Sequence, residues 1–173
     1  MKRLNARSIS LMTAIFFYGI LLGGIVYAHV VFFPPYLSAL PNSAALVNGP
    51  YALHDENFWT LIHPVTILSL LVALVLNWKT PARRKLIAIP LTLYIIAIVV
   101  TFIYFVPELR EFRASPNSGV SAAEWFARGQ RWQHFSWLRG AIMGLAMVPL
   151  LLALITPEKV SEPGAVATGS SGG

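Results

Sequence analysis

The sequence contains no cysteine among its 173 residues. Disulfide bonds, thiolate metal sites and covalently attached c-type haem are therefore excluded. Membrane thiol oxidoreductases, which need paired cysteines, are excluded as well. Any redox chemistry in this chain needs a bound cofactor, a metal held by histidine or carboxylate, or a substrate that is itself reactive.

Charged residues are also scarce. Only 12% of the chain is Asp, Glu, Lys or Arg, whereas 56% is hydrophobic, and the mean hydropathy is +0.65. This balance is far from that of a soluble domain and is typical of an integral membrane protein. Four apolar stretches are about 20 residues or longer, enough to cross roughly 30 Å of hydrocarbon as helices. They are Ser8–Phe33, Phe58–Trp78, Leu86–Val106 and Arg131–Ile155.

The predicted fold is an all-α, integral membrane four-helix bundle formed by residues 1–156. Residues 157–173 are rich in Pro, Gly and Ser and are predicted to form a disordered C-terminal tail. A secretory signal followed by three spans is the disfavoured alternative. The first apolar run is too long for a signal, and no small-residue cleavage site precedes polar sequence.

Lysine and arginine are absent between Ser8 and Trp78. Basic residues instead precede the first apolar stretch and follow the second: Lys2, Arg3, Arg7, Lys79, Arg83, Arg84 and Lys85. The positive-inside rule therefore predicts an inner-membrane protein whose two termini and second loop are cytoplasmic. Four arginines in the third loop oppose this bias, but glutamates in the same loop offset them. The net charge of +6 is thus attributed to topology, and no nucleic-acid partner is expected.

Prolines and glycines mark the expected helix ends and contacts. Pro34-Pro35 is predicted to end the first helix, and Pro107 the third. The long outer loop that follows Pro34 contains turn signals and apolar residues, so it is expected to cap the mouth of the bundle. Gly19-x-x-x-Gly23 has the spacing that lets helices approach closely, either inside the bundle or between copies of the chain.

The fourth helix is predicted to begin well before the membrane. Ser121 and Glu124 have the spacing of a capping box, which places the helix start at Ala122 and predicts a helix about 50 Å long that ends at Ile155. Glu124 and Arg128 are spaced for an ion pair within the helix. Arg139 is the deepest charge of the chain and needs a partner. Glu108 is the nearest carboxylate at a similar predicted depth.

Three histidines fall at matching depths near the outer face: His29, His63 and His134. Ionisable groups are costly in hydrocarbon, so this layer is a candidate site. His29 and His63 come from neighbouring antiparallel helices and are candidate ligands of a b-type haem. Adding His134 or Glu108 gives candidate ligands for a copper, iron or zinc ion. Histidines that only hydrogen-bond loops or headgroups are common at this depth, so a chain without any cofactor stays open.

Aromatic residues in the same layer predict an organic ligand instead. Trp59 and Trp132 are expected to help form a pocket for a flat lipophilic molecule such as a quinone or polycyclic phenol. Their alternative role is the aromatic belt at the membrane surface. Within such a pocket, His63 is the predicted general base and Arg139 the anion stabiliser, with Glu108 as a further catalytic candidate.

Four short sequences resemble a broad family of small four-helix membrane proteins that includes anthrone oxygenases. They are the Gly-rich run Gly19–Gly24, the pair Pro34-Pro35, Val106-Pro107-Glu108 and the opening of the fourth helix from Trp132 to Arg139. The resemblance covers most of residues 10–155. It implies a four-helix membrane fold and oxygenation of an activated aromatic compound without an obligatory metal.

Three classes of function therefore remain. The first is a membrane oxidoreductase or oxygenase that acts on a small lipophilic ligand. The second is a non-catalytic accessory subunit that binds haem, a metal or another ligand in a larger membrane complex. A transporter or channel is less favoured, because no inverted repeat and no charged pathway across the membrane is visible. Membrane lipids are expected partners in each case, and a homo-oligomer is compatible with all three.

Overall fold

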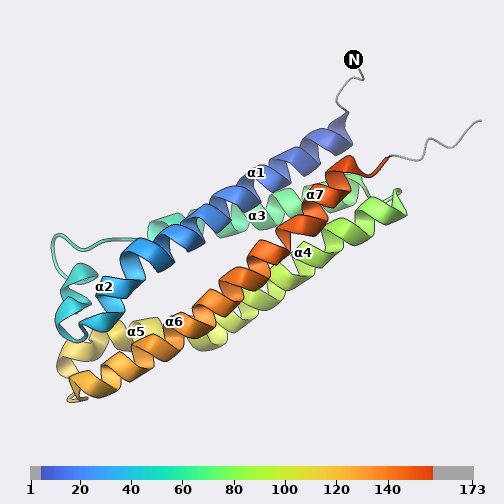
Figure 1. Ribbon diagram of the computed structural model, residues 1–173. Helices are drawn as coiled ribbons and strands as arrows, with labels where there is room; N and C mark the ends of the chain where they lie inside the picture. The colour runs from blue at the N-terminus through green and yellow to red at the C-terminus, as the bar shows by residue number, and fades with distance from the viewer. Residues whose placement is uncertain (1–4, 158–173) are drawn as a thin grey trace, which may run out of the picture.

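The computed structural model describes residues 5–157 and places them in four helical rods that run up and down beside one another (Figure 1). The rods span Ala6–Ser38, Glu56–Leu76, Pro81–Asn117 and Ala122–Ile155, and each is long and apolar enough to cross a membrane. No strand occurs in residues 5–157. The predicted all-α membrane four-helix bundle is confirmed. The predicted tail, apart from its first residue, lies outside the described range.

The first rod contains a change of helix type near the end that leads into the following loop. α1 (Ala6–Tyr27) begins at Asn5, whose Oδ1 accepts a hydrogen bond from the backbone nitrogen of Ser8 at 2.9 Å. A π-helical turn, η1 (Ala28–Phe32), follows α1, and α2 (Phe33–Ser38) completes the rod. The rod is therefore longer than predicted at this end.

The expectation that Pro34-Pro35 ends the first helix is wrong. Both prolines lie in the first turn of α2, directly after the π turn. Backbone nitrogens in a first turn need no intrahelical acceptor, so prolines are tolerated there. Pro107 repeats this arrangement in the third rod, where α5 (Val106–Ala114) follows a second π turn, η3 (Thr101–Phe105). That rod also continues beyond its predicted end.

The remaining elements complete the third and fourth rods. The third rod starts with α4 (Pro81–Val100) and ends with a short 3-10 turn, η4 (Ser115–Asn117). The fourth rod consists of α6 (Ala122–Leu145) and α7 (Met147–Ile155), which meet at Ala146.

The predicted start of the fourth helix is confirmed. Ser121 Oγ accepts a hydrogen bond from the backbone nitrogen of Glu124 at 3.2 Å, so α6 begins at the next residue after this cap. The predicted pair of Glu124 with Arg128 is wrong. Arg128 instead binds Glu108 of α5 through two hydrogen bonds of 3.2 and 3.0 Å. A bidentate pair between two helices uses both carboxylate oxygens and the planar guanidinium together.

The loop between the first two rods forms the predicted cap. Between the first two rods the chain makes a 3-10 helix, η2 (Asn42–Leu46), before α3 (Glu56–Leu76) begins. Apolar residues of this segment pack with residues of η1, α2, η3, α5 and α6 in one buried cluster. The cap cluster consists of Ala28, Phe33, Tyr36, Leu37, Leu40, Ala44, Val47, Phe105, Phe112, Trp125 and Trp132.

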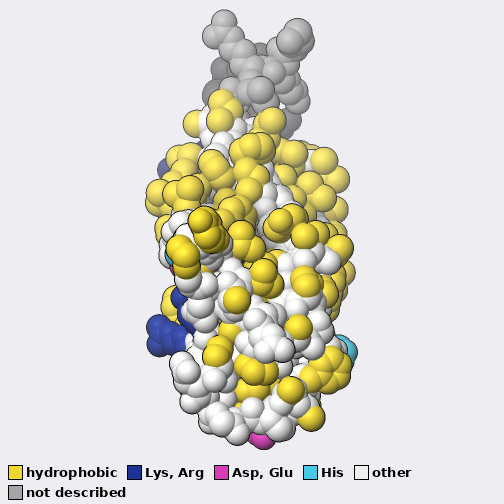
Figure 2. All heavy atoms as spheres, turned by 90° about the vertical axis from the view of Figure 1, so that its left-hand side faces the viewer, with side chains coloured by type: hydrophobic (Ala, Val, Ile, Leu, Met, Phe, Trp, Pro, Cys, Tyr) yellow, Lys and Arg dark blue, Asp and Glu magenta, His cyan; other side chains and the backbone are white. Residues whose placement is uncertain are grey.

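A second apolar cluster fills the bundle between the cap and the chain ends. Here α1 packs mainly against α3 and α7, and α4 packs against α7 and α3. Large apolar side chains cover the outside as well, and Phe102 and Ile103 are 67% and 74% exposed, as expected of a surface in contact with lipid. Figure 2 looks onto the loop end, where charged side chains occur only at the margins of the view.

Both described ends of the chain lie at the end of the bundle opposite the cap (Figure 1). An even number of crossings requires this arrangement, and it agrees with the predicted topology. That this end is cytoplasmic remains a prediction.

The Gly19-x-x-x-Gly23 pattern does not mark the tightest helix contact. A Cβ atom at Gly23 would meet no atom within 4 Å, and one at Gly19 would meet only Met147 Cε at 3.9 Å. A Cβ atom at Gly24 would instead collide with the ring of Phe58 on α3. Close packing inside the bundle is therefore achieved at Gly24 rather than at Gly23.

Candidate functional site

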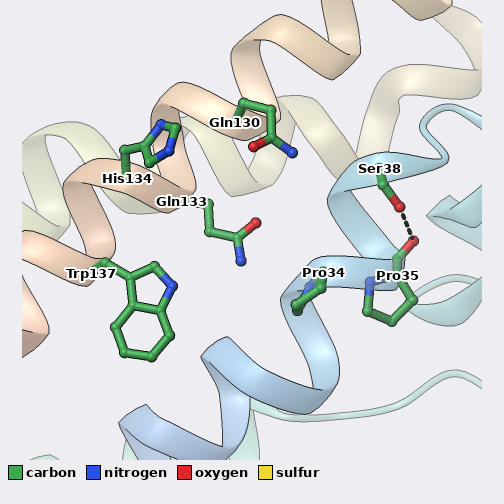
Figure 3. A pocket seen from close by; sticks show the side chains of 7 residues that line it. All are labelled: Pro34, Pro35, Ser38, Gln130, Gln133, His134 and Trp137. Carbon is green, nitrogen blue, oxygen red and sulfur yellow. Dashed lines mark hydrogen bonds between the residues drawn. The ribbon is translucent and has the colours of Figure 1, made fainter.

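The structure places two of the predicted histidines inside the bundle and the third on its surface. His29 lies in η1 and is 3% exposed, and His63 lies half-buried on α3. His134 is exposed on α6, where it lines a groove next to α2 (Figure 3). Within residues 5–157, no three His, Cys, Asp or Glu side chains are grouped to hold a metal ion. The predicted three-histidine site is therefore not formed.

Hydroxyl groups from two helices hold the deepest charge, Arg139. Its Nη1 donates to Thr101 Oγ1 at 2.6 Å, and its Nη2 donates to Ser136 Oγ at 3.0 Å. The guanidinium also lies over the ring of Phe105, 4.0 Å from the ring centre. Thr101 is the first residue of η3, so the second π turn presents its hydroxyl to the arginine.

His29 extends these hydrogen bonds to the first rod. Its Nδ1 lies 2.7 Å from the carbonyl oxygen of Ile25, and its Nε2 lies 2.8 Å from Ser136 Oγ. A carbonyl only accepts, so the network assigns the proton of a neutral ring to Nδ1. Nε2 then accepts the Ser136 hydroxyl, which in turn accepts from Arg139. We call Arg139, Ser136, Thr101 and His29 the arginine network.

His63 is oriented by a hydrogen bond outside the arginine network. Its Nδ1 lies 2.6 Å from Tyr94 Oη on α4. The Nδ1–H tautomer of His63 donates this hydrogen bond, and the Nε2–H tautomer accepts it from the tyrosine hydroxyl. No hydrogen bond among the described residues uses Nε2.

An indole ring covers one face of His63. The rings of Trp59 and His63 are stacked with their centres 5.8 Å apart and an interplanar angle of 26°. Trp59 Nε1 donates to Asp55 Oδ2 at 3.1 Å, which fixes the indole. Asp55 precedes α3, and burial raises the pKa of its carboxyl above the ordinary value. Trp59 thus lies beside the predicted general base.

The guanidinium of Arg139 is linked to the imidazole of His29 through the hydroxyl of Ser136. In the part of the chain that the structure describes, no carboxylate pairs with this guanidinium. The predicted partner, Glu108, uses both of its oxygens for Arg128. A half-buried cation inside a membrane span without a counter-ion is costly, which is characteristic of a binding site for an anionic or strongly polar group.

The residues do not fit the predicted haem. His29 has both ring nitrogens occupied by Ile25 and Ser136, so it has none available for an iron. Trp132, predicted to help form a pocket for a flat lipophilic molecule or cofactor, is 1% exposed and donates Nε1 to the carbonyl of Phe105 at 3.2 Å. It therefore belongs to the core of the cap. His29 supports the arginine network, and only Trp59 and His63 lie together as the predicted site requires.

The sequence interpretation missed three hydroxyl residues of this site. Ser136 is fully buried, Tyr94 is buried, and Thr101 is half-buried. One signal was available, because Ser136 precedes Arg139 by three residues and so lies on the same face of the helix. Thr101 also lies near the outer end of its apolar stretch, at a depth that matches Arg139.

Comparisons with protein-family models, with curated proteins and with solved structures find no match for this chain. The resemblance to the anthrone oxygenase-like family therefore remains a prediction.

Proposed function

We propose that this protein is a membrane oxidoreductase that binds a flat lipophilic phenol or quinone-like molecule and removes a proton from it. The observation that carries the proposal is the guanidinium of Arg139, which has hydroxyl partners but no carboxylate among the described residues. Further N–H groups of the guanidinium remain for a ligand. His63 also has a ring nitrogen, Nε2, that makes no hydrogen bond among the described residues.

The two side chains have complementary roles in this reaction. An oxygen of the bound molecule accepts hydrogen bonds from Arg139, while Nε2 of His63 takes a proton from a hydroxyl or from a C–H next to a carbonyl. Negative charge then develops on the oxygen beside the guanidinium, which stabilises it strongly because little water is present. This role requires the Nδ1–H tautomer of His63, whose hydrogen bond to Tyr94 Oη holds the ring in place.

The surroundings support a lipophilic aromatic ligand. Trp59 stacks on His63, and Phe105 lies against Arg139. Both basic groups are inside spans whose outer surfaces are apolar, so a ligand dissolved in the bilayer would reach them without crossing water.

The resemblance to anthrone oxygenases supports a second step with dioxygen. The carbanion formed from an anthrone-type methylene would be oxidised by dioxygen, so that the CH₂ group becomes a carbonyl and one water molecule leaves. The two hydrogens and one oxygen atom of dioxygen form that water, and the other oxygen atom becomes the carbonyl oxygen.

Anthrone is a direct probe of the proposal. Detergent-purified protein is mixed with anthrone, the anion is followed by visible absorption, and oxygen consumption is followed with an electrode. Arg139→Met should weaken binding by roughly ten- to hundred-fold, as for loss of a hydrogen bond to a charged group worth about 1.5–3 kcal/mol. His63→Gln should bind anthrone without forming the anion.

Arg131→Met is the matched control, because Arg131 is an exposed arginine on the same helix. It should behave like the wild-type protein. Wild-type protein that fails to bind anthrone, or an anion that forms equally well in His63→Gln, would overturn the proposal. Binding without any proton transfer or oxygen consumption would instead favour the non-catalytic accessory subunit.

A further inference from the structure

A groove of about 520 Å³ lies between α2 and α6, on the outside of the bundle near the cap (Figure 3). The α2 side is formed by the Pro34-Pro35 pair and Ser38. Its backbone is rigid there, because the prolines fix their own dihedral angles. The Ser38 hydroxyl lies near the carbonyl of Pro35, at 3.5 Å.

The α6 side of the groove carries the polar side chains Gln130, Gln133, His134 and Trp137. Figure 3 shows Gln130 and Gln133 pointing across the groove toward α2, with Trp137 closing one end. In residues 5–157, none of these four side chains makes a hydrogen bond within the protein. Two amides, an imidazole and an indole N–H therefore remain as donors and acceptors for a bound molecule.

The lining selects for an uncharged polar group. No Lys, Arg, Asp or Glu side chain contributes to the groove, so neither a phosphate nor an ammonium group would find an opposite charge there. Primary amides and an imidazole suit hydroxyl and carbonyl oxygens, which they bind by donating and accepting neutral hydrogen bonds. An indole edge or face suits the apolar part of the same molecule.

The position of the groove supports an amphiphilic ligand. On α6 the sequence changes from charged to mainly apolar close to Gln133, as expected where a helix enters the hydrocarbon. On the first rod, the exposed side chains of Val30 and Val31 lie about one turn before the two prolines, closer to the middle of the span. A polar head bound in the groove would therefore leave its apolar tail along this lipid-facing surface.

We propose that the α2–α6 groove binds the uncharged, hydroxyl- or carbonyl-bearing head of a lipophilic molecule. Two sources share this chemistry, namely a neutral glycerolipid of the bilayer and an aromatic alcohol of the kind that the arginine network would bind. The inference rests on the groove alone and does not depend on the proposed reaction at Arg139.

Protection of His134 from diethyl pyrocarbonate tests the proposal, with exposed His54 as an internal control in the same sample. The full chain is placed in phosphatidylcholine nanodiscs with dioctanoylglycerol, with 2-methyl-1,4-naphthohydroquinone or with decanoate, and labelling is measured by mass spectrometry. At a ligand concentration about ten times Kd, labelling of His134 should fall about ten-fold with at least one neutral compound. Labelling of His54 should not change.

Gln133→Leu should abolish this protection while leaving the labelling of His134 without ligand unchanged. Protection by dioctanoylglycerol identifies the lipid as the occupant, and protection by the hydroquinone identifies the aromatic alcohol. Arg139→Met should retain the protection, which separates this site from the proposed reaction. Protection by neither compound, or equal protection by the charged decanoate, would overturn the inference.

Discussion

At the scale of single residues, His29 and His63 differ in how many ring nitrogens the protein uses. His29 donates to Ile25 O and accepts from Ser136, whereas His63 bonds to Tyr94 through Nδ1 and makes no hydrogen bond through Nε2 among the described residues.

The proposed reaction requires the Nδ1–H tautomer of His63, and Tyr94→Phe tests this assignment. Without the phenolic oxygen, Nδ1 of His63 loses its acceptor, so the Nε2–H tautomer gains population and less of the base remains. A hydrogen bond worth about 1 kcal/mol corresponds to a roughly five-fold loss of anthrone anion formation. The change in tautomer is measured by nitrogen-15 NMR of histidine-labelled protein.

Tyr27→Phe is the control, because Tyr27 is 64% exposed and makes no hydrogen bond through its hydroxyl among the described residues. It should leave both the tautomer and the anion unchanged. An unaltered His63 spectrum in Tyr94→Phe would contradict the assignment.

At the scale of helices, close approach of α2 and α6 depends on one glycine that the sequence interpretation did not single out. A Cβ atom at Gly129 would lie 3.0 Å from the carbonyl oxygen of Leu37 and 3.1 Å from its Cβ. The first is a backbone atom and the second is bonded directly to the backbone, so neither can shift unless the backbone of α2 moves with it. The contact sets the distance between α2 and α6 next to the groove.

Gly129→Ala should lower the free energy of unfolding by about 1–3 kcal/mol, the usual effect of overpacking. Gly144→Ala is the matched control on the same helix, since a Cβ atom there meets nothing within 4 Å. It should be neutral or should stabilise the helix by up to about 1 kcal/mol. Denaturant titration in detergent micelles measures both, and equal effects of the two substitutions would refute this account of the contact.

Hydropathy and capping were sufficient to predict the number of rods and the start of α6. The rod ends at Pro34 and Pro107 were not predictable from the same rules, because a π turn before each proline removes the expected conflict. The partner of Arg139 was also mispredicted. Glu108 was predicted because it lies at a similar depth along the bundle. In the structure the arginine of α6 that binds Glu108 is Arg128, and the partners of Arg139 are the hydroxyls of Thr101 and Ser136.

At the scale of the whole molecule, the chain offers a natural background for mapping its topology. It has no cysteine, so a single introduced thiol is the only one to react with a maleimide. Asn48 lies in the cap loop and Lys79 lies in the turn at the opposite end of the bundle, and both side chains are exposed.

In whole cells, Asn48→Cys should react with a membrane-impermeant maleimide, whereas Lys79→Cys should react only after the membrane is opened. The expectation follows from the basic residues that flank the second loop. Labelling is read as a mass shift on a gel. The opposite pattern would reverse the orientation of the bundle while leaving its fold intact.

The two π turns also determine how the chain tolerates insertions and deletions. Each accommodates one more residue than a regular helical turn, which rotates everything that follows by about 100°. Deleting one residue within residues 28–32 would restore a regular α-helix. It would also rotate Tyr36 and Leu37 away from Trp125 and Trp132, with which they form the cap cluster. Such a deletion removes only one amino acid and yet separates the cap from α6. The turn at Asn48-Gly49 is exposed, so the loss or gain of one residue is better tolerated there.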